Sequence, residues 1–264
     1  VAERKHLGGS CVNFGCTPTK AVLASAKLAH QAKRAAEFGL DIPKVSVDYD
    51  AVLERARRIS AESREGLKRT FSEGNPELLE GHAKFVGRDG KNFKLEVNGK
   101  IILAKQVVLN TGTRSVIPKI DGLEDIPFIH VGNWLEHTRL PEYIVILGAG
   151  YIALEMSQFY ARMGSRVTVI GESSQVVARE DEDVATMLQT LLQKEGITFY
   201  LNTNVTSLRK KGKKIIVTFN RTDASPKENK VVSDTFESNS QEAQTIEASH
   251  FFVATGRKPN TDDL

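Results

Sequence analysis

The sequence predicts an α/β fold divided between two domains, and three observations lead to this prediction. A β-α-β pattern begins at Tyr143, where a short apolar strand, a glycine turn, a helix and a second strand follow one another. Two helical segments precede this pattern, and short β-like segments lie between those helices and Tyr143. With 264 residues, of which 40% are hydrophobic, the chain is long enough to fill the cores of two medium domains.

The N-terminal part is expected to contain two helices followed by an antiparallel meander. Residues 17–38 are rich in Ala, Leu and Lys at helical spacing and end at Gly39, and residues 50–71 carry a second apolar stripe. From Leu78 onward the segments HAKFVG, NFKLEV and KIILAKQVVLNTG alternate with Gly and Asn turns. They predict a meander that ends in a buried strand at residues 107–110.

The C-terminal part is expected to begin after an irregular crossing segment between Pro118 and Pro141. The polar, Ser- and Asn-rich residues 221–244 predict a hairpin with an enlarged, mobile loop. The regular elements expected in this part are helices at 151–163 and 182–195 and strands at 143–147, 166–170, 197–200, 205–209, 214–220 and 249–254.

Composition and charge argue against several classes of protein. The 36 basic and 33 acidic side chains leave a formal net charge of +3, which gives no support to nucleic-acid binding. No apolar run reaches the roughly 18 residues that span a bilayer, and no signal-type hydrophobic core follows the N-terminus. We therefore expect a soluble, cytoplasmic protein that binds neither nucleic acid nor membrane.

Cys11 and Cys16 are the two cysteines of the chain, and four residues separate them at the start of the first predicted helix. Backbone N–H groups at a helix start favour negative charge, so a thiolate at Cys16 or nearby is stabilised there. The spacing permits a disulfide that reduction reopens. Two unrelated buried thiols, or half of a metal site, are the alternatives. A zinc site needs two more N or S ligands, and the six histidines are scattered without ligand spacing.

The segment ILGAGYIALE, residues 146–155, predicts a dinucleotide site. It places Gly148 and Gly150 after a strand and before a helix, so that the backbone can approach a pyrophosphate whose charge the helix N-terminus favours. Tyr151 and Ile152 open that helix and are expected to contact the cofactor as well. A chance glycine turn is the alternative.

The choice between NADH and NADPH depends on the residues after the second strand of this unit. Glu172 lies two residues beyond Ile170, and an acidic side chain there can bond the ribose 2′-hydroxyl. Arg179 is the nearby cation that could instead suit a 2′-phosphate. The sequence therefore favours NADH and leaves NADPH open.

The segment GGSCVNFGCTPTK resembles the active-site signature of the group I pyridine nucleotide-disulfide oxidoreductases, and its ending is most similar to the mercuric-reductase-like branch. The family also includes glutathione reductase and dihydrolipoamide dehydrogenase. By this resemblance Cys11 would be the interchange thiol facing the substrate, and Cys16 the thiol facing the flavin and forming the charge-transfer complex. Lys20 would lie near the flavin ring, where a cation stabilises reduced flavin. The paired Gly8 and Gly9 are implied to contact FAD.

Glu155 matches the family position that helps couple the nicotinamide site to the flavin and lysine side. A helix glutamate in a solvated row is the alternative for this residue. Two strand-ending segments, NTG at 110–112 and ATGR at 254–257, resemble the crossover motifs that border the nicotinamide domain in this family. The residues implied to lie near the cofactor in these motifs are Thr111, Gly112, Thr255, Gly256 and Arg257.

The resemblance implies two Rossmann-like, three-layer domains, with the NAD(P)-binding domain at 119–253 inserted into a partial FAD-binding domain at 1–118 and 254–264. The implied function is an FAD-dependent NAD(P)H:disulfide, or mercuric-ion-type, oxidoreductase. Its substrate would be a small-molecule disulfide, dithiol or metal ion, and the full-length parent would be a homodimer. The family's first FAD glycine motif, its later Gly-Asp motif and its C-terminal interface domain are not found in these residues, which leaves the activity of this chain open. The alternative is a nicotinamide-binding redox sensor without turnover of its own.

Overall fold

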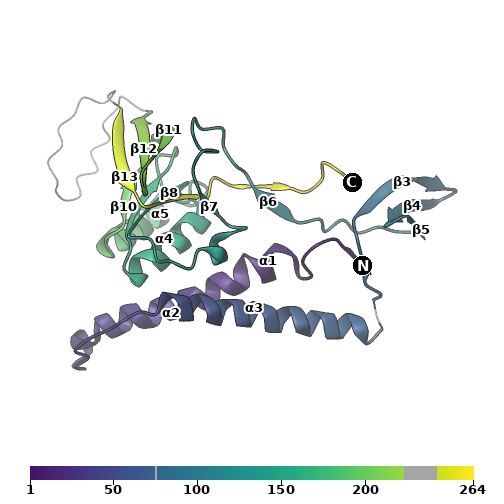
Figure 1. Cartoon of the computed structure of the whole chain (residues 1–264), viewed down its shortest axis with the longest axis horizontal. Coiled ribbons are helices and arrows are strands. Elements are labelled where there is room, and N and C mark those ends of the chain that lie inside the picture. Colours follow the sequence, from purple (N-terminus) through teal and green to yellow (C-terminus); the bar gives the residue numbers. More distant parts are fainter. Residues whose placement is uncertain (75, 223–242) are drawn as a thin grey trace. The chain divides into compact units, whose positions relative to one another are not determined.

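The computed structural model describes residues 1–74, 76–222 and 243–264, and the chain divides into two compact units (Figure 1). The loop predicted within residues 221–244 falls mostly on 223–242, which lie outside the described residues. Unit 1 comprises Val1–Val22, Ala51–Arg114 and Arg257–Leu264, and unit 2 comprises Leu23–Asp50 and Ser115–Gly256.

Unit 2 is built on a five-stranded parallel sheet in the order β10-β9-β8-β14-β7. The apolar runs of the central strands are buried on both faces, as a covered parallel sheet requires. The predicted strands at 143–147 and 166–170 are confirmed, and they pair in parallel from Tyr143 and Arg166 to Leu147 and Ile170. The strands are β7 (Ile129–His130), β8 (Tyr143–Leu147), β9 (Arg166–Ile170), β10 (Thr198–Tyr200) and β14 (His250–Val253).

Two further layers cover this sheet. The antiparallel sheet β11-β12-β13 shares a core with one face, where Val145 and Leu147 pack with Val217 and Phe219. Helix α4 contacts β8 and β9, and we place it over the opposite face, where the alternate residues of β8 are buried. The elements are α4 (Tyr151–Met163), α5 (Glu182–Lys194), β11 (Thr203–Lys211), β12 (Lys214–Arg221), β13 (Gln244–Ala248) and the 3-10 turn η2 (Trp134–Glu136).

An ion pair joins α4 to the end of α5. The guanidinium of Arg162 donates two hydrogen bonds of 2.7 Å to the carboxylate of Glu195, and both side chains are largely buried. Burial by itself raises the pKa of Glu195, but the hydrogen bonds and the charge of Arg162 outweigh it, so the pKa lies below its usual value. The carboxylate is therefore held ionised between the two helices.

Unit 1 contains the start of α2, most of α3, a meander and short paired segments. The predicted meander is confirmed as the antiparallel sheet β3-β4-β5. Two short pairs, β1-β2 and β15-β6, complete the unit. The elements are β1 (Ala2–Glu3), α1 (Gly9–Asn13), α2 (Cys16–Lys33), α3 (Tyr49–Ser72), β2 (Leu79–Glu80), β3 (Ala83–Asp89), β4 (Asn92–Val97), β5 (Lys100–Ala104), β6 (Thr113–Ser115) and β15 (Arg257–Pro259).

Three predictions about the elements need correction. The helix expected at 17–38 ends at Lys33, and a 3-10 turn, η1 (Ala35–Phe38), carries the chain to Gly39. The buried strand expected at 107–110 is wrong, because Val108 is 83% exposed and the segment pairs with no strand among the described residues. An apolar segment is buried only where a layer covers it. The crossing segment after Pro118 contains β7, which extends the parallel sheet.

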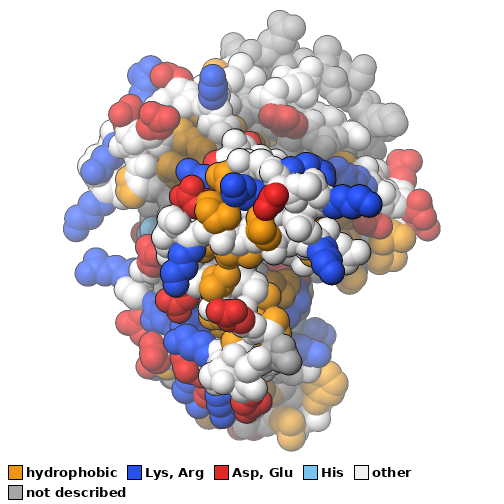
Figure 2. Space-filling model, turned by 90° about the vertical axis from the view of Figure 1, so that its right-hand side faces the viewer, with side chains coloured by type: hydrophobic (Ala, Val, Ile, Leu, Met, Phe, Trp, Pro, Cys, Tyr) orange, Lys and Arg blue, Asp and Glu red, His pale blue; other side chains and the backbone are white. Residues whose placement is uncertain are grey.

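Hydrophobic side chains also reach the surface, interspersed with charged ones (Figure 2). In unit 1 they come from the meander and the segment that follows it, where Val86, Ile101, Leu103 and Leu109 are each between 45% and 54% exposed. Within the described part of the chain, no helix is both long and apolar enough to cross a bilayer.

Candidate functional site

A tight turn brings the two cysteines together in unit 1. Cys11 lies in α1, and Cys16 is the first residue of α2. The backbone N–H groups of Phe14 and Gly15 both donate to the Ser10 carbonyl, at 3.0 and 2.7 Å. A Cβ at Gly15 would stand 3.0 Å from that same oxygen, so glycine keeps the turn tight. Both cysteines are free thiols on the surface of the chain.

The side chain of Cys16 lies close enough to Cys11 to influence the protonation of the Cys11 thiol. A hydrogen bond with the Cys16 side chain is the largest cause that raises the pKa of the Cys11 thiol, and burial and the charge of Cys16 add to it. The backbone N–H of Cys16 and the charge of Lys20 act in the opposite direction but more weakly. The Cys11 thiol therefore keeps its proton in a hydrogen bond with the Cys16 side chain, and this contact makes the two cysteines a dithiol.

Replacing Cys16 therefore has a predictable effect on Cys11. In a Cys16→Ala variant the largest cause that raises the pKa of Cys11, the hydrogen bond with the Cys16 side chain, disappears together with the charge of Cys16. Burial, the backbone N–H at position 16 and Lys20 remain, so the pKa falls. The pH profile of Cys11 alkylation by iodoacetamide should shift to lower pH. At pH values below the pKa of Cys11, the alkylation rate should rise about threefold for each pH unit by which the pKa falls. The reason is that the gain in thiolate fraction exceeds the loss in thiolate nucleophilicity. An unchanged or upward-shifted profile contradicts the thiol contact.

The predicted glycines and lysine flank the dithiol. Gly8 has a φ of +87° as N-cap of α1, and a Cβ there would lie 2.8 Å from Val12 and 2.9 Å from Leu67. Gly9 has a φ of +58°, with no atom within 4 Å of an added Cβ. Lys20 is exposed and lies one helical turn beyond Cys16.

The dinucleotide motif forms the turn between β8 and α4 in unit 2. Gly148 has a φ of +108°, and a Cβ there would meet the Ala254 carbonyl oxygen at 2.4 Å. Gly150 is the N-cap of α4 in extended conformation, and no atom lies within 4 Å of where its Cβ would stand. Tyr151 is 68% exposed and Ile152 is half-buried in the first turn. This open helix start offers backbone N–H groups to an anion.

The residues after β9 approach the same turn. Gly171 is buried, and a Cβ there would stand 2.7 Å from the Cβ of Ala149 in the glycine turn. The N–H of Val177 donates to the Ala149 carbonyl at 2.8 Å, which closes the loop back onto the turn. Glu172 is exposed directly after this contact, and Arg179 is exposed further along. Glu172 is thus the first side chain after β9 that is free to face a ligand.

The two crossover motifs lie side by side through the pair β6-β15. Arg257 donates from Nε to the hydroxyl of Thr113 at 2.6 Å and from its other nitrogen to the Thr113 carbonyl at 2.7 Å. The Thr255 hydroxyl donates to the Val116 carbonyl at 2.9 Å. The backbone N–H of Asn260 donates to the Gly112 carbonyl at 3.0 Å. Residues 113–116 therefore pair with residues 255–257, directly after the first motif and within the second.

The predicted residues are divided between the two units, and each group is described within its own unit. Glu155 lies on α4 and is half-buried. Unit 1 holds Gly8, Gly9, Cys11, Cys16, Lys20, Thr111, Gly112 and Arg257, and unit 2 holds Gly148, Gly150, Tyr151, Ile152, Glu155, Glu172, Thr255 and Gly256.

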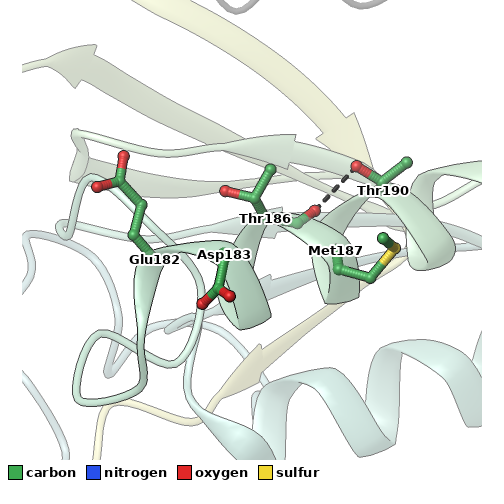
Figure 3. A pocket seen from close by; sticks show the side chains of 5 residues that line it. All are labelled: Glu182, Asp183, Thr186, Met187 and Thr190. Atoms are coloured by element: carbon green, nitrogen blue, oxygen red, sulfur yellow. Dashed lines mark hydrogen bonds between the residues drawn. The ribbon is translucent and has the colours of Figure 1, made fainter.

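A shallow hollow on α5 of unit 2 contains none of the predicted residues (Figure 3). Glu182, Asp183, Thr186, Met187 and Thr190 line it, and the Thr190 hydroxyl donates to the Thr186 carbonyl at 2.8 Å. Two carboxylates at its rim repel the phosphates of a nucleotide. Within the described residues, no group of three or more His, Cys, Asp or Glu could hold a metal ion.

Comparison with known proteins shows the family to which the chain belongs. The family model for pyridine nucleotide-disulphide oxidoreductases matches residues 2–264. The chain belongs to this family. It is 33% identical over 263 residues to a dihydrolipoyl dehydrogenase of Cupriavidus necator and 30% identical over 269 residues to a mercuric reductase of Streptomyces lividans. These alignments cover 98% and 100% of the chain but 51% and 52% of the two relatives, so the chain spans about half of their length.

Two solved structures have the same fold as this chain. The HOCl-induced flavoprotein disulfide reductase of Escherichia coli superposes with a TM-score of 0.77 at 24% identity, and LpdA of Mycobacterium tuberculosis with 0.80 at 21%. The whole chain is covered in both cases, against 52% and 54% of those proteins. The predicted α/β fold with Rossmann-like architecture is therefore confirmed.

Sequence reasoning missed two features of the site. One is the buried side chain of Asn13, which hydrogen-bonds to Arg64 of α3. An asparagine inside the dithiol signature was a signal for it, but nothing local marks an arginine 51 residues away. The other is the contact between Ala149 and Gly171, which only the fold brings together.

Proposed function

We propose that this chain supplies the dithiol and nicotinamide-binding parts of an FAD-dependent NAD(P)H:disulfide, or mercuric-ion-type, oxidoreductase. The observation that carries the proposal is the contact between the thiols of Cys11 and Cys16 at the start of α2, in a member of this family. The substrate class is a small-molecule disulfide, dithiol or soft metal ion. The full-length parent is proposed to be a cytoplasmic homodimer, as the family resemblance implies.

The chemistry proposed for the cysteines is thiol-disulfide exchange. The Cys11–Cys16 disulfide accepts two electrons and two protons and becomes two thiols. The thiolate of Cys11 then attacks a substrate disulfide and expels one substrate thiol, which leaves a mixed disulfide on Cys11. Cys16 attacks the Cys11 sulfur, releases the second substrate thiol and restores the protein disulfide. A soft metal ion would instead bind between the two thiolates.

The residues present fit both cofactors. Gly150 leaves open space at the N-terminus of α4 for a nicotinamide pyrophosphate, and Gly9 leaves similar space beside the dithiol. A bound flavin supplies two-electron transfer between nicotinamide and disulfide. On the flavin side we propose Gly8, Gly9, Lys20 and the paired crossover motifs, Thr111, Gly112, Thr255, Gly256 and Arg257. Glu155 is proposed to couple the nicotinamide side to the flavin side.

We propose NADH as the preferred nicotinamide cofactor. Ala149 leaves no space for a side chain at position 171, so the acid that meets the ribose hydroxyls comes from Glu172. The proposed domain borders are retained, with an NAD(P)-binding domain at 119–253 between FAD-binding segments at 1–118 and 254–264. The changes between units at residues 114–115 and 256–257 lie close to both borders and support them, whereas residues 23–50 group with unit 2.

An optical experiment tests the proposed function. The chain is incubated with FAD, freed of unbound flavin and reduced anaerobically with two electrons. Retained flavin should develop a new long-wavelength band, because in the proposed role a thiolate at Cys16 would interact with the flavin. The band should be lost in Cys16→Ser and kept in Cys11→Ser, its matched control. Bound flavin without such a band contradicts the assignment. A reversible Cys11–Cys16 disulfide in a chain that binds nicotinamide but no flavin favours the alternative, a redox sensor.

A further inference from the structure

The structure points to Arg64 and Asn13 as a positioning pair for the dithiol, and we propose that Arg64, acting through the Asn13 amide, holds Cys11 in register to form its disulfide with Cys16. This inference rests on the proposed function and adds two residues to it. Neither residue contacts a reacting atom in the proposal. Both act on the backbone that carries Cys11.

The Asn13 amide uses its hydrogen-bonding groups inside the protein. The side chain is 4% exposed, and Asn13 is one of the few buried polar residues of unit 1. Its Nδ2 donates to the Leu7 carbonyl at 3.1 Å and to the Gly9 carbonyl at 2.7 Å. Its Oδ1 accepts from the guanidinium of Arg64 at 2.9 Å. Both amide hydrogens and the carbonyl oxygen are thereby satisfied, so the amide has one defined orientation.

These contacts fix the segment that carries Cys11. Leu7 and Gly9 lie just before Cys11, and Asn13 lies between the two cysteines, so the amide ties the backbone at the entry and first residue of α1 to the end of α1. Disulfide closure requires a narrow range of Cα and Cβ separations. A segment that can shift spends only part of its time in that range. The hydrogen bonds of the Asn13 amide therefore raise the effective concentration of the Cys11 sulfur near the Cys16 sulfur.

Arg64, which lies on a different helix, fixes the orientation of the Asn13 amide. Arg64 lies on α3, 51 residues beyond Asn13. Its half-buried guanidinium donates a hydrogen bond to the Asn13 oxygen, so this oxygen faces α3. Without this donor the buried Asn13 oxygen loses its partner, and the amide can rotate away from the Leu7 and Gly9 carbonyls. The charges that act on the Cys11 thiol are those of Cys16 and Lys20. We therefore assign to Arg64 an effect on position and not on the charge at sulfur.

The test is the thiol-disulfide equilibrium of the full chain with glutathione, which needs neither cofactor. The protein dithiol and one molecule of oxidised glutathione give the protein disulfide and two molecules of reduced glutathione. The ratio is read by alkylation and mass spectrometry. We expect Arg64→Met to lower the equilibrium constant for disulfide formation about tenfold, equal to about 30 mV. Arg64→Lys keeps a donor and a charge and should recover part of the loss.

Arg55→Met is the matched control. Arg55 lies on the same helix and donates one hydrogen bond of 2.9 Å to the Ala21 carbonyl, outside the segment that holds Cys11. It should change thermal stability to a similar extent while leaving the glutathione equilibrium unchanged.

Two results overturn the positioning role. One is an unchanged equilibrium in both Arg64→Met and Arg64→Lys, and the other is an equal shift in Arg55→Met, which indicates a general loss of stability. Should Arg64→Met fail to fold, Arg64→Lys carries the comparison. An unsubstituted chain that forms no Cys11–Cys16 disulfide at any glutathione ratio overturns the proposed function and this inference together. A normal disulfide that is indifferent to Arg64 overturns this inference alone.

Discussion

Gly150→Ala is expected to lower the affinity for nicotinamide nucleotide about 100-fold while leaving the fold intact. The residue has a φ of −81°, which alanine adopts freely, and no protein atom lies within 4 Å of the added methyl group. That space is where a pyrophosphate would approach the N-terminus of α4, so the methyl group displaces the ligand and not the protein. Binding is measured by titration of NADH into the full chain, with thermal unfolding recorded in parallel.

Gly148→Ala is the counterpart that should damage the fold first. Its φ of +108° is unfavourable for alanine, and the new methyl group would lie 2.4 Å from the Ala254 carbonyl oxygen. Strained backbone costs about 1–3 kcal/mol, and the clash adds to it. The free energy of unfolding should therefore fall in Gly148→Ala and change by less than about 0.5 kcal/mol in Gly150→Ala. Undiminished NADH binding in a folded Gly150→Ala chain contradicts the dinucleotide site.

Glu172→Arg is expected to reverse the preference between NADH and NADPH. In the proposed site the carboxylate accepts hydrogen bonds from the ribose hydroxyls and repels a 2′-phosphate. Hydrogen bonds to charged groups contribute about 1.5–3 kcal/mol, so the ratio of the two dissociation constants should change by about 10- to 100-fold or more. The measurement is equilibrium titration of both nucleotides into the unsubstituted chain and the variant.

Two further variants separate the contributions to this preference. Glu172→Gln removes the charge but keeps the shape, and it should weaken NADH binding and reduce the discrimination against NADPH. Arg179→Gln should leave the binding of NADH unchanged. A chain that binds NADPH more tightly, and loses that binding in Arg179→Gln, contradicts the role of Glu172 and assigns the 2′-position to the arginine.

The sequence predicted those parts of the fold whose signals are local. The strands and helix from Tyr143 to Ile170 were predicted to the residue, because apolar runs, two glycines and a terminal glycine mark every boundary. The short strands β7 and β13 were missed, because two to five residues carry little periodicity and depend on their partners. Segment 107–110 has the composition of a buried strand but lacks a covering layer in the described residues.

The candidate site divides in the same way. Cysteine spacing and glycine turns carry their signals within a few residues, so Cys11, Cys16 and Gly148 could be proposed as site residues from the sequence alone. Contacts between segments that are distant in the sequence have no local sequence pattern that predicts them. The hydrogen bond from Arg64 to Asn13 and the approach of Gly171 to Ala149 depend on how α3 and β9 pack, which no local pattern encodes.

The pairing of β6 with β15 has a consequence for how such a protein can be assembled from parts. The N–H of Val116 donates to the Gly256 carbonyl at 3.0 Å, so the two ends of segment 116–256 touch. A segment whose ends meet can be inserted into a host chain at little cost in chain entropy, because the host spans it as it would span a short turn. Residues 116–256 can therefore be exchanged between relatives as one inserted segment, provided that the host chain also supplies matching contacts from residues 23–50, which belong to the same unit.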